Sequence, residues 1–265
     1  MTRRVHRASA WGIALALTGL LSGQASSADC PQPGDPQTVR LLVAAIERRL
    51  PAAPPAVVVE VKDNRGGTRQ LLAHYQPARA PQASGGWTVL TRNGAPVPPK
   101  RAGKLAAHLA KDGPPMSAYH IRRYLAGRIL GARPLSASVN AGAEADGRWL
   151  VRIAPLGPGS VVLKGEDLSA SLAAELVVRC EEGAGAVVED ARLSLIAPRR
   201  LRWFVTLKDA RGRQRFGQDR QGRIVLLEEH LEAIVDPLIL PSFRYVFTRV
   251  YRDHRFPDDP ANGDS

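Results

Sequence analysis

Apolar residues recur every three or four positions near the start of the chain and at every second position in its C-terminal half. Asp35-Pro36 has the pattern of a helix start, and Pro51 marks the stop. The apolar residues between them lie on one face of a helix: Val39, Leu42, Val43, Ile46 and Leu50. From residue 135 onwards the period is two, which is typical of strands with one buried face. The pattern predicts an amphipathic N-terminal helix followed by a sheet.

Three short strands and two short helices are expected between these regions. Residues 56–62 and 68–76 are predicted to pair as a hairpin, and residues 87–91 form a third strand before the turn signal Asn93-Gly94. Helices are expected over residues 101–111 and 117–130, separated by a Gly-Pro-Pro sequence. This helical insertion interrupts the strands.

Further strands are predicted from residue 135 to the C-terminus, with glycine-containing turns between them. They span residues 135–140, 148–154, 160–163, 169–179, 186–196, 201–209, 214–218, 223–229 and 243–252. Because strands joined by short turns pair antiparallel, we expect an antiparallel sheet rather than βαβ units. Residues 29–256 are assigned to a single α+β domain, and residues 257–265 to a polar, frayed tail.

The first 28 residues have the pattern of an export signal. Three arginines precede an apolar run over residues 8–21, and Ser26 and Ala28 suit the −3 and −1 positions of a signal-peptidase site. A membrane anchor needs about 20 apolar residues, and this run is shorter. We therefore expect cleavage after Ala28, a periplasmic location and no stable transmembrane anchor.

Two variants of this export signal stay open. Thr2-Arg3-Arg4 is similar to a twin-arginine signal, although His6 stands where that motif has an apolar residue. Cys30 is close enough to the cut for lipidation, although Asp29 precedes it.

Cys30 and Cys180 are the two cysteines of the chain. In an exported protein this even, minimal number predicts one disulfide. Such a bond would close a loop of about 150 residues and contribute about 4–5 kcal/mol on the chain-entropy description. Two widely separated thiols without clustered histidines do not have metal-ligand spacing, so neither a metal nor a cofactor is expected.

The chain is basic, with a formal net charge of +12. Removal of residues 1–28, which hold three arginines and no acidic residue, lowers it to +9. Two stretches concentrate arginine beside aromatic residues: Arg199, Arg200, Arg202, Arg211, Arg213 and Arg215. In an exported protein these arginines favour anionic lipid headgroups or cell-wall polymers over nucleic acid as partners. A merely solvated surface is the alternative.

The last predicted strand alternates aromatic or aliphatic residues with polar ones. Alternation is expected to place the aromatic residues toward the core or a cavity, with Arg244 and Arg249 on the outer side. The strand either closes the core with a basic outer face or lines a ligand groove. The candidate lining residues are Phe243, Tyr245, Phe247, Tyr251 and Trp203.

Catalytic motifs are missing from the sequence. Glu228–Glu232 contains one histidine and not the pair of H-E-x-x-H, and the segment around Ser160 does not fit G-x-S-x-G. The chain is therefore expected to have no catalytic residues and not to be an enzyme. A triad assembled across the fold stays open. It would need a serine or carboxylate in a cleft beside one of these residues: His74, His120, His230 or His254.

Two segments carry a resemblance to a known family, Leu168–Val178 and the strand Ala191–Ile196 that ends at Pro198. Together with the order of predicted elements, they resemble the LolA-like superfamily of periplasmic lipoprotein carriers at the level of architecture, over residues 36–252. The resemblance implies an open antiparallel β half-barrel around helices, whose apolar concavity holds lipid or lipoprotein acyl chains. The alternative function is a non-enzymatic envelope protein that docks on anionic surfaces through a basic edge.

Overall fold

The computed structural model describes residues 37–64, 69–79, 81, 84–111, 113–135, 147–163, 166–181, 185–202 and 204–259. The predicted export signal, Cys30, Trp203 and most of the strand predicted over residues 135–140 lie outside the described residues. Asp35 and Pro36, the expected helix start, lie outside them as well.

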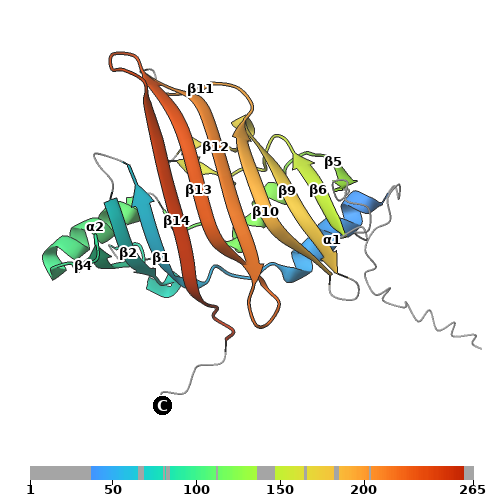
Figure 1. Ribbon diagram of the computed structural model, residues 1–265, viewed down its shortest axis with the longest axis horizontal. Helices are drawn as coiled ribbons and strands as arrows, with labels where there is room; N and C mark the ends of the chain where they lie inside the picture. Colours follow the sequence, from blue (N-terminus) through green and yellow to red (C-terminus); the bar gives the residue numbers. More distant parts are fainter. Residues whose placement is uncertain are drawn as a thin grey trace, which may run out of the picture.

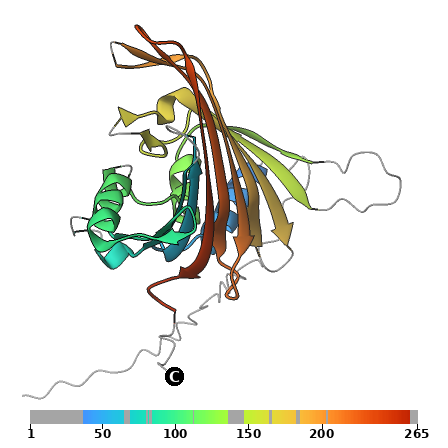
Figure 2. The same ribbon diagram turned by 60° about the vertical axis from the view of Figure 1, so that its left-hand side comes forward.

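The described residues form a large, open antiparallel sheet of twelve strands (Figure 1). In spatial order its strands are β4 (Ala95–Pro96), β3 (Trp87–Arg92), β2 (Arg69–Tyr75), β1 (Ala56–Asp63), β14 (Phe243–Arg255), β13 (Ile224–Pro237), β12 (Val205–Gln218), β10 (Gly185–Leu195), β9 (Leu172–Glu181), β6 (Arg148–Ile153) and β5 (Ile129–Pro134), with β11 (Arg199–Arg202) paired to β12. Figures 1 and 2 show the sheet twisted and curved, with β4 and β5 at its two ends.

The first hairpin joins the sheet beside the last strand. β1 pairs with β2 on one side and with β14 on the other, so Val59 lies opposite Tyr251. The hairpin turn Asn93-Gly94 has the positive φ angles, 52° and 81°, that its sequence predicts. The consecutive strands β5–β6, β9–β10, β12–β13 and β13–β14 pair antiparallel, as predicted, and β6 pairs with β9 and β10 with β12 in the same way.

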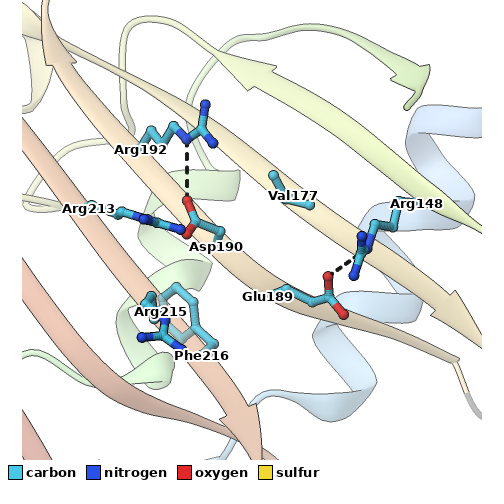
Figure 3. Close-up of a pocket in the computed structure, with 8 residues that line it drawn as sticks. All are labelled: Arg148, Val177, Glu189, Asp190, Arg192, Arg213, Arg215 and Phe216. Atoms are coloured by element: carbon cyan, nitrogen blue, oxygen red, sulfur yellow. Dashed lines mark hydrogen bonds and ion pairs between the residues drawn. The ribbon is translucent and has the colours of Figure 1, made fainter. Parts of the chain in front are cut away.

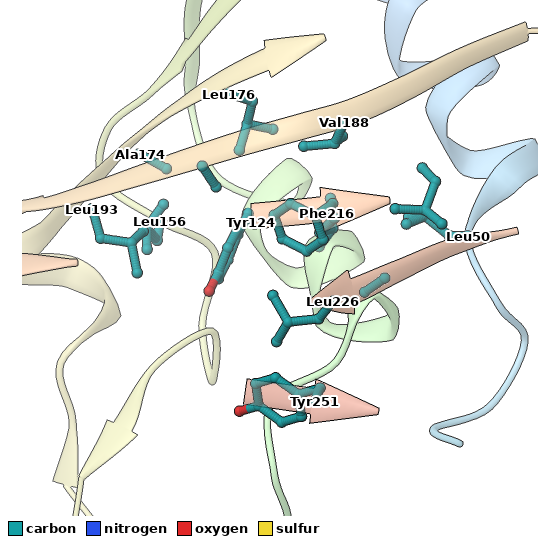
Figure 4. Close-up of a cluster of buried hydrophobic side chains, with 14 of the residues drawn as sticks. Leu50, Tyr124, Leu156, Ala174, Leu176, Val188, Leu193, Phe216, Leu226 and Tyr251 are labelled. Atoms are coloured by element: carbon teal, nitrogen blue, oxygen red, sulfur yellow. The ribbon is translucent and has the colours of Figure 1, made fainter. Parts of the chain in front are cut away.

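Helices cover the inner, concave face of the sheet. α1 (Thr38–Arg49) packs on β10, α2 (Pro99–Lys111) on β3, and η2 (Ala118–His120) continues into α3 (Ile121–Leu125), close to β13. Their buried side chains and those of the sheet form one apolar cluster, in which Tyr124 lies between Phe216 and Leu193 (Figure 4). Shorter elements complete the chain: η1 (Pro77–Arg79), β7 (Val162–Leu163), β8 (Glu166–Asp167) and η3 (Ser169–Ser171).

The helix predicted over residues 117–130 is wrong in its second half. α3 ends at Leu125, and Ile129 begins the edge strand β5. Gly127 packs tightly against the chain that follows β6, because a Cβ at this position would lie 2.5 Å from the carbonyl oxygen of Pro155. This close approach and the pairing of β5 with β6 override the helical spacing of the apolar residues.

The glycine-containing turn predicted between the strands 201–209 and 214–218 is also wrong. β12 runs without interruption through Gly212, which faces the side chains of Leu193 and Leu231 inside the sheet. Its partner β13 continues to Pro237, past the predicted end at residue 229. The two long strands pair along their whole length, so tertiary pairing outweighs a local glycine signal.

The C-terminal tail is attached to the sheet at its start. Arg223 forms ion pairs with Asp258 at 3.0 Å, with Asp259 at 2.5 Å and with Asp219 at 2.6 Å. Its guanidinium carbon also lies 3.9 Å from the centre of the Phe256 ring. The prediction of a frayed tail over residues 257–265 is therefore wrong for Asp258 and Asp259, and residues 260–265 lie outside the described part.

Candidate ligand-binding face of the sheet

An aromatic stripe follows the inner face of β14. Because side chains alternate along a strand, Tyr251 shares this face with Phe247, Tyr245 and Phe243. Exposure rises along the stripe: Tyr251 is 3% exposed and lies in the core, Tyr245 and Phe247 are half-buried, and Phe243 is 51% exposed. The rings of Tyr245 and Phe247 lie 5.7 Å apart. The stripe thus runs from the core to the surface.

Small and aliphatic side chains of β13 lie beside the aromatic stripe. The register places Leu231 opposite Phe247, Ala233 opposite Tyr245 and Val235 opposite Phe243. The ends of β11 to β14 extend beyond the helices and beyond the β7–β8 hairpin (Figure 2). Half-buried apolar residues therefore continue along the inner face, past the part that the helices cover.

A charged pair lies at the core end of the aromatic stripe. Arg249 Nη1 is 3.4 Å from Glu229 Oε2, and the Tyr251 hydroxyl donates to the same oxygen at 2.9 Å. Arg249 also lies over the Phe247 ring, 4.8 Å from its centre. The predicted outward position of Arg249 is therefore wrong: it shares the inner face with Phe247 and Tyr251, whereas Arg244 does point outward, to Glu232.

The surroundings keep the Arg249 guanidinium charged while the Tyr251 hydroxyl stays neutral. Burial disfavours the charged guanidinium, yet the oxygens of Tyr251 and Glu229 hold the pKa of Arg249 above its usual range. Burial, and then the negative charge of Glu229, raise the pKa of Tyr251. Arg249 Nε is buried without a hydrogen-bond partner. A buried donor of this kind is costly, and it lies at the inner end of the stripe.

Tyr124 connects the helical layer to the same region. Its side chain is 1% exposed, and its hydroxyl lies 3.2 Å from Gln214 Oε1 on β12. Burial raises the pKa of its hydroxyl. Sequence reasoning missed Tyr124, Gln214 and Glu229 as interior polar residues. The only sequence signal for Gln214 and Glu229 is a polar residue at an inward position of an alternating strand.

The basic stretch Arg211–Arg215 lies on the outer face of the sheet, where its arginines have carboxylate partners. Arg211 is 3.2 Å from Asp209, Arg213 is 2.6 Å from Asp190, and Arg215 is 3.2 Å from Glu228. A depression of about 410 Å³ lies on this face, and Figure 3 shows the side chains that line it. It is lined by Arg148, Val177, Glu189, Asp190, Arg192, Arg213, Arg215 and Phe216. The carboxylates compensate much of the positive charge of these arginines, which the sequence analysis assigned to contact with an anionic partner.

The other basic stretch is less uniform. Arg199 is half-buried and donates to the Ser171 hydroxyl at 2.9 Å, so it belongs partly to the packing of β11. Arg200 is exposed on the same strand. The backbone of Arg202 is placed opposite Val205.

Three of the described histidines make contacts that belong to the fold. His120 lies beside Ser117, whose backbone N–H donates to His120 Nδ1 at 3.1 Å in a capping box at the start of η2. His230 is 3.0 Å from the Thr248 hydroxyl, and His254 is 2.9 Å from the Leu226 carbonyl oxygen. The Ser117–His120 contact therefore serves to begin a short helix.

Lowering the pH is expected to destabilise the protein through His120. Burial and the neighbouring Arg123 lower its pKa to about 4 from an ordinary value of 6.5. Between these values the unfolded chain binds a proton that the folded chain does not, so the free energy of unfolding falls as the pH falls. The loss is at most about 3 kcal/mol. Urea unfolding at pH 7 and pH 4 should therefore show a smaller difference for His120→Gln than for the unsubstituted protein. Equal differences would contradict this role of His120.

Cys180 is disulfide-bonded and packs against the core. The other cysteine of the sequence, Cys30, lies outside the described residues, so the pairing of the two stays a prediction. Within the described ranges, no cluster of three or more potential metal-ligating side chains is present. No helix in that part of the chain has the length and apolar character needed to cross a membrane.

Comparison of the chain with protein family models, with curated proteins and with solved structures finds no match.

Proposed function

We propose that the protein is a periplasmic carrier that shelters an apolar chain, of the kind found in lipids and lipoproteins, in an open half-barrel similar to that of the LolA-like carriers. The chain lies along the aromatic stripe of β14 and the apolar residues of β13 opposite it. The export signal and the absence of catalysis belong to the same proposal.

The observation that carries the proposal is the exposure gradient along the stripe. Aromatic side chains on the inner face of a sheet normally pack against a second layer, yet Phe243 is 51% exposed and Tyr245 and Phe247 are only half-buried. An acyl chain laid on these rings would remove apolar surface from water, at about 25 cal/mol per Å² buried.

The core end of the stripe adds a polar contact of the right kind. Arg249 Nε is a buried donor without a partner, next to the ring of Phe247. An ester or carboxyl oxygen at the head of an acyl chain would accept from it. The ligand is then an acyl chain with an oxygen-bearing head, held by apolar contact along the stripe and one hydrogen bond at its end.

Docking through the basic edge has less support than the carrier function. The arginines of the stretch 211–215 face carboxylates at 2.6–3.2 Å, and Arg199 binds Ser171. Paired surface charges of this kind attract a distant anionic partner only weakly, because their fields cancel.

Binding of an acyl probe tests the proposal. The fluorescent fatty acid cis-parinaric acid should bind the unsubstituted protein at one site, and native mass spectrometry of freshly purified protein should show bound lipid. Replacing two rings of the stripe, in the double variant Tyr245→Ser with Phe247→Ser, should weaken probe binding at least tenfold. A tenfold loss equals about 1.4 kcal/mol, which is less than the transfer free energy of one buried aromatic ring.

The matched control lies on the opposite face of the same strand. Val246→Ser with Thr248→Ser changes two outward positions of β14 and should leave the affinity within twofold. If the protein carries no lipid and the probe does not bind, or if both double variants lose affinity equally, the stripe is not a cargo site.

A further inference from the structure

The three most exposed large apolar residues among the described positions are consecutive. Leu238, Ile239 and Leu240, between β13 and β14, are 71%, 84% and 66% exposed. Phe243 follows at 51%, and Phe204, 37% exposed, lies at the same end because its carbonyl accepts from the Leu238 backbone N–H at 2.8 Å. We call these five residues the apolar tip. A continuous apolar patch on a protein surface marks an interaction site more often than scattered residues do.

The base of the apolar tip is held in place. The Ser242 hydroxyl donates to Asp236 at 2.6 Å, and Lys208 pairs with the same carboxylate at 2.8 Å. These contacts close the loop from below, and Pro237 and Pro241 restrict its backbone on both sides. The three aliphatic side chains are thus presented at the far end of the long strands, where Figure 2 shows β11 to β14 extending beyond the rest of the molecule.

Basic residues surround the apolar tip. Lys208 and Arg244 are 53% and 65% exposed, and Arg200 is exposed on β11, where the backbone register places it opposite Thr206 of β12. We call these three residues the basic collar. Lys208 and Arg244 pair with Asp236 and Glu232. With three cations beside these two carboxylates, the collar carries more positive than negative formal charge.

We propose that the apolar tip inserts into the surface of a lipid bilayer with anionic headgroups, and that the basic collar contacts the headgroups around it. Aliphatic residues at a projecting loop suit the acyl region, and long basic side chains beside them reach the phosphate layer. Lys and Arg near an anionic bilayer surface also attract it electrostatically. The inference goes beyond the proposed carrier function and does not require bound cargo, although the tip lies at the open end of the aromatic stripe.

A folded protein partner fits this surface less well. Stable protein interfaces bury about 800 Å² on each partner and rely on Trp, Tyr and Arg rather than Leu, whereas the apolar tip is a narrow loop of aliphatic residues. A second copy of the chain would bring two basic collars together, and their like charges repel. Charge complementarity therefore selects an anionic lipid surface.

Vesicle binding tests the inference. The protein is purified after export to a bacterial periplasm and sedimented with vesicles of phosphatidylcholine and phosphatidylglycerol in a 7:3 ratio, a composition chosen as about one-third anionic, like a bacterial surface. The triple variant Leu238→Ser, Ile239→Ser, Leu240→Ser should lose at least tenfold in partitioning. The matched control replaces three other exposed apolar residues, Leu130→Ser, Val162→Ser and Ile196→Ser, and should bind within twofold of the unsubstituted protein. All variants share one N-terminus, so any lipid attached at Cys30 contributes equally to their binding. Differences between the variants therefore report on the apolar tip.

The depth to which the apolar tip inserts and the electrostatic attraction of the basic collar are measured in separate experiments. The variant Ile239→Trp adds a fluorophore at the tip, and its emission, after subtraction of the emission of the unsubstituted protein, should shift to the blue on vesicles. Lipids brominated on the acyl chain should quench this added emission. Pure phosphatidylcholine vesicles, or added salt, should reduce binding because the basic collar then has no anionic surface to contact.

Several results would overturn the inference. They are undiminished vesicle binding by the triple variant, equal losses in both triple variants, or no quenching of the emission that the Ile239→Trp substitution adds. Another is self-association that the triple variant abolishes while no form binds vesicles. Binding of cis-parinaric acid by the triple variant should stay unchanged, because the aromatic rings of the stripe are intact. Failure of docking is thus distinguished from failure of the carrier function.

Discussion

Replacing Tyr124 by alanine should lower the free energy of unfolding by about 3–5 kcal/mol, as large-to-small substitutions of buried aromatic residues do. Tyr124 is 1% exposed and contributes the largest fully buried side chain of the core. It lies where α3 meets the inner face of β10 and β12, between Leu193 and Phe216 (Figure 4). Its removal leaves a cavity that rigid strands on one side and a short helix on the other cannot close. Urea unfolding followed by circular dichroism measures the loss.

The conservative variant Tyr124→Phe separates packing from hydrogen bonding. It keeps the ring and removes only the hydroxyl that lies 3.2 Å from Gln214, so the expected loss is about 1–2 kcal/mol, the cost of leaving Gln214 without this partner. If alanine and phenylalanine destabilise equally, the ring does not fill the space between α3 and the sheet.

Neutralising Glu229 should cost about 3 kcal/mol, because it leaves Arg249 charged and largely buried without its carboxylate. The side chains of Glu229 and Arg249 are 10% and 18% exposed, and their 3.4 Å contact lies at the core end of the aromatic stripe. The variant Glu229→Gln keeps the shape and the capacity to accept from Tyr251. Its effect therefore reports the missing charge rather than a cavity, and urea unfolding measures it.

A double-mutant cycle provides the control for Glu229. The double variant Glu229→Gln with Arg249→Met removes both charges and should recover a large part of the stability, since a buried pair replaced by neutral groups is often tolerated. Additive losses in the double variant would show that the two residues act separately.

The two proposed surfaces lie on one continuous path. Phe243 belongs to both, at the exposed end of the aromatic stripe and at the edge of the apolar tip. An acyl chain leaving a bilayer at the tip would meet Tyr245 and Phe247 next along β14 before reaching Arg249. The ends of β11 to β14 would thus place the proposed cargo site beside the membrane. Docking on the bilayer would then bring the site to the acyl chain that it takes up.

Part of this arrangement follows from local sequence. The alternation in Leu172–Val178, the helical spacing from Thr38 to Arg49 and the Asn93-Gly94 turn all correspond to elements of the structure. These features depend on nearest neighbours, and their periods of 2 and 3.6 are independent of the rest of the chain. The aromatic residues of the last strand were likewise recognisable as one inward row.

The apolar tip had a sequence signal that sequence reasoning missed. Leu238, Ile239 and Leu240 form an aliphatic run between two prolines, which neither a helix nor a central strand readily includes. Such a run indicates an exposed apolar loop once its ends are known to join two paired strands.

Local pattern alone determined that this chain forms an amphipathic helix and a succession of antiparallel strands, because burial of one face imposes a period on each element. The tertiary structure decided which strands are neighbours and which residues share a site. Placement of β1 beside β14 joins Val59 to Tyr251, and the register of β14 turns Arg249 inward to Glu229. These are contacts between segments far apart in the chain, chosen by the packing of the whole core, and no local period carries them.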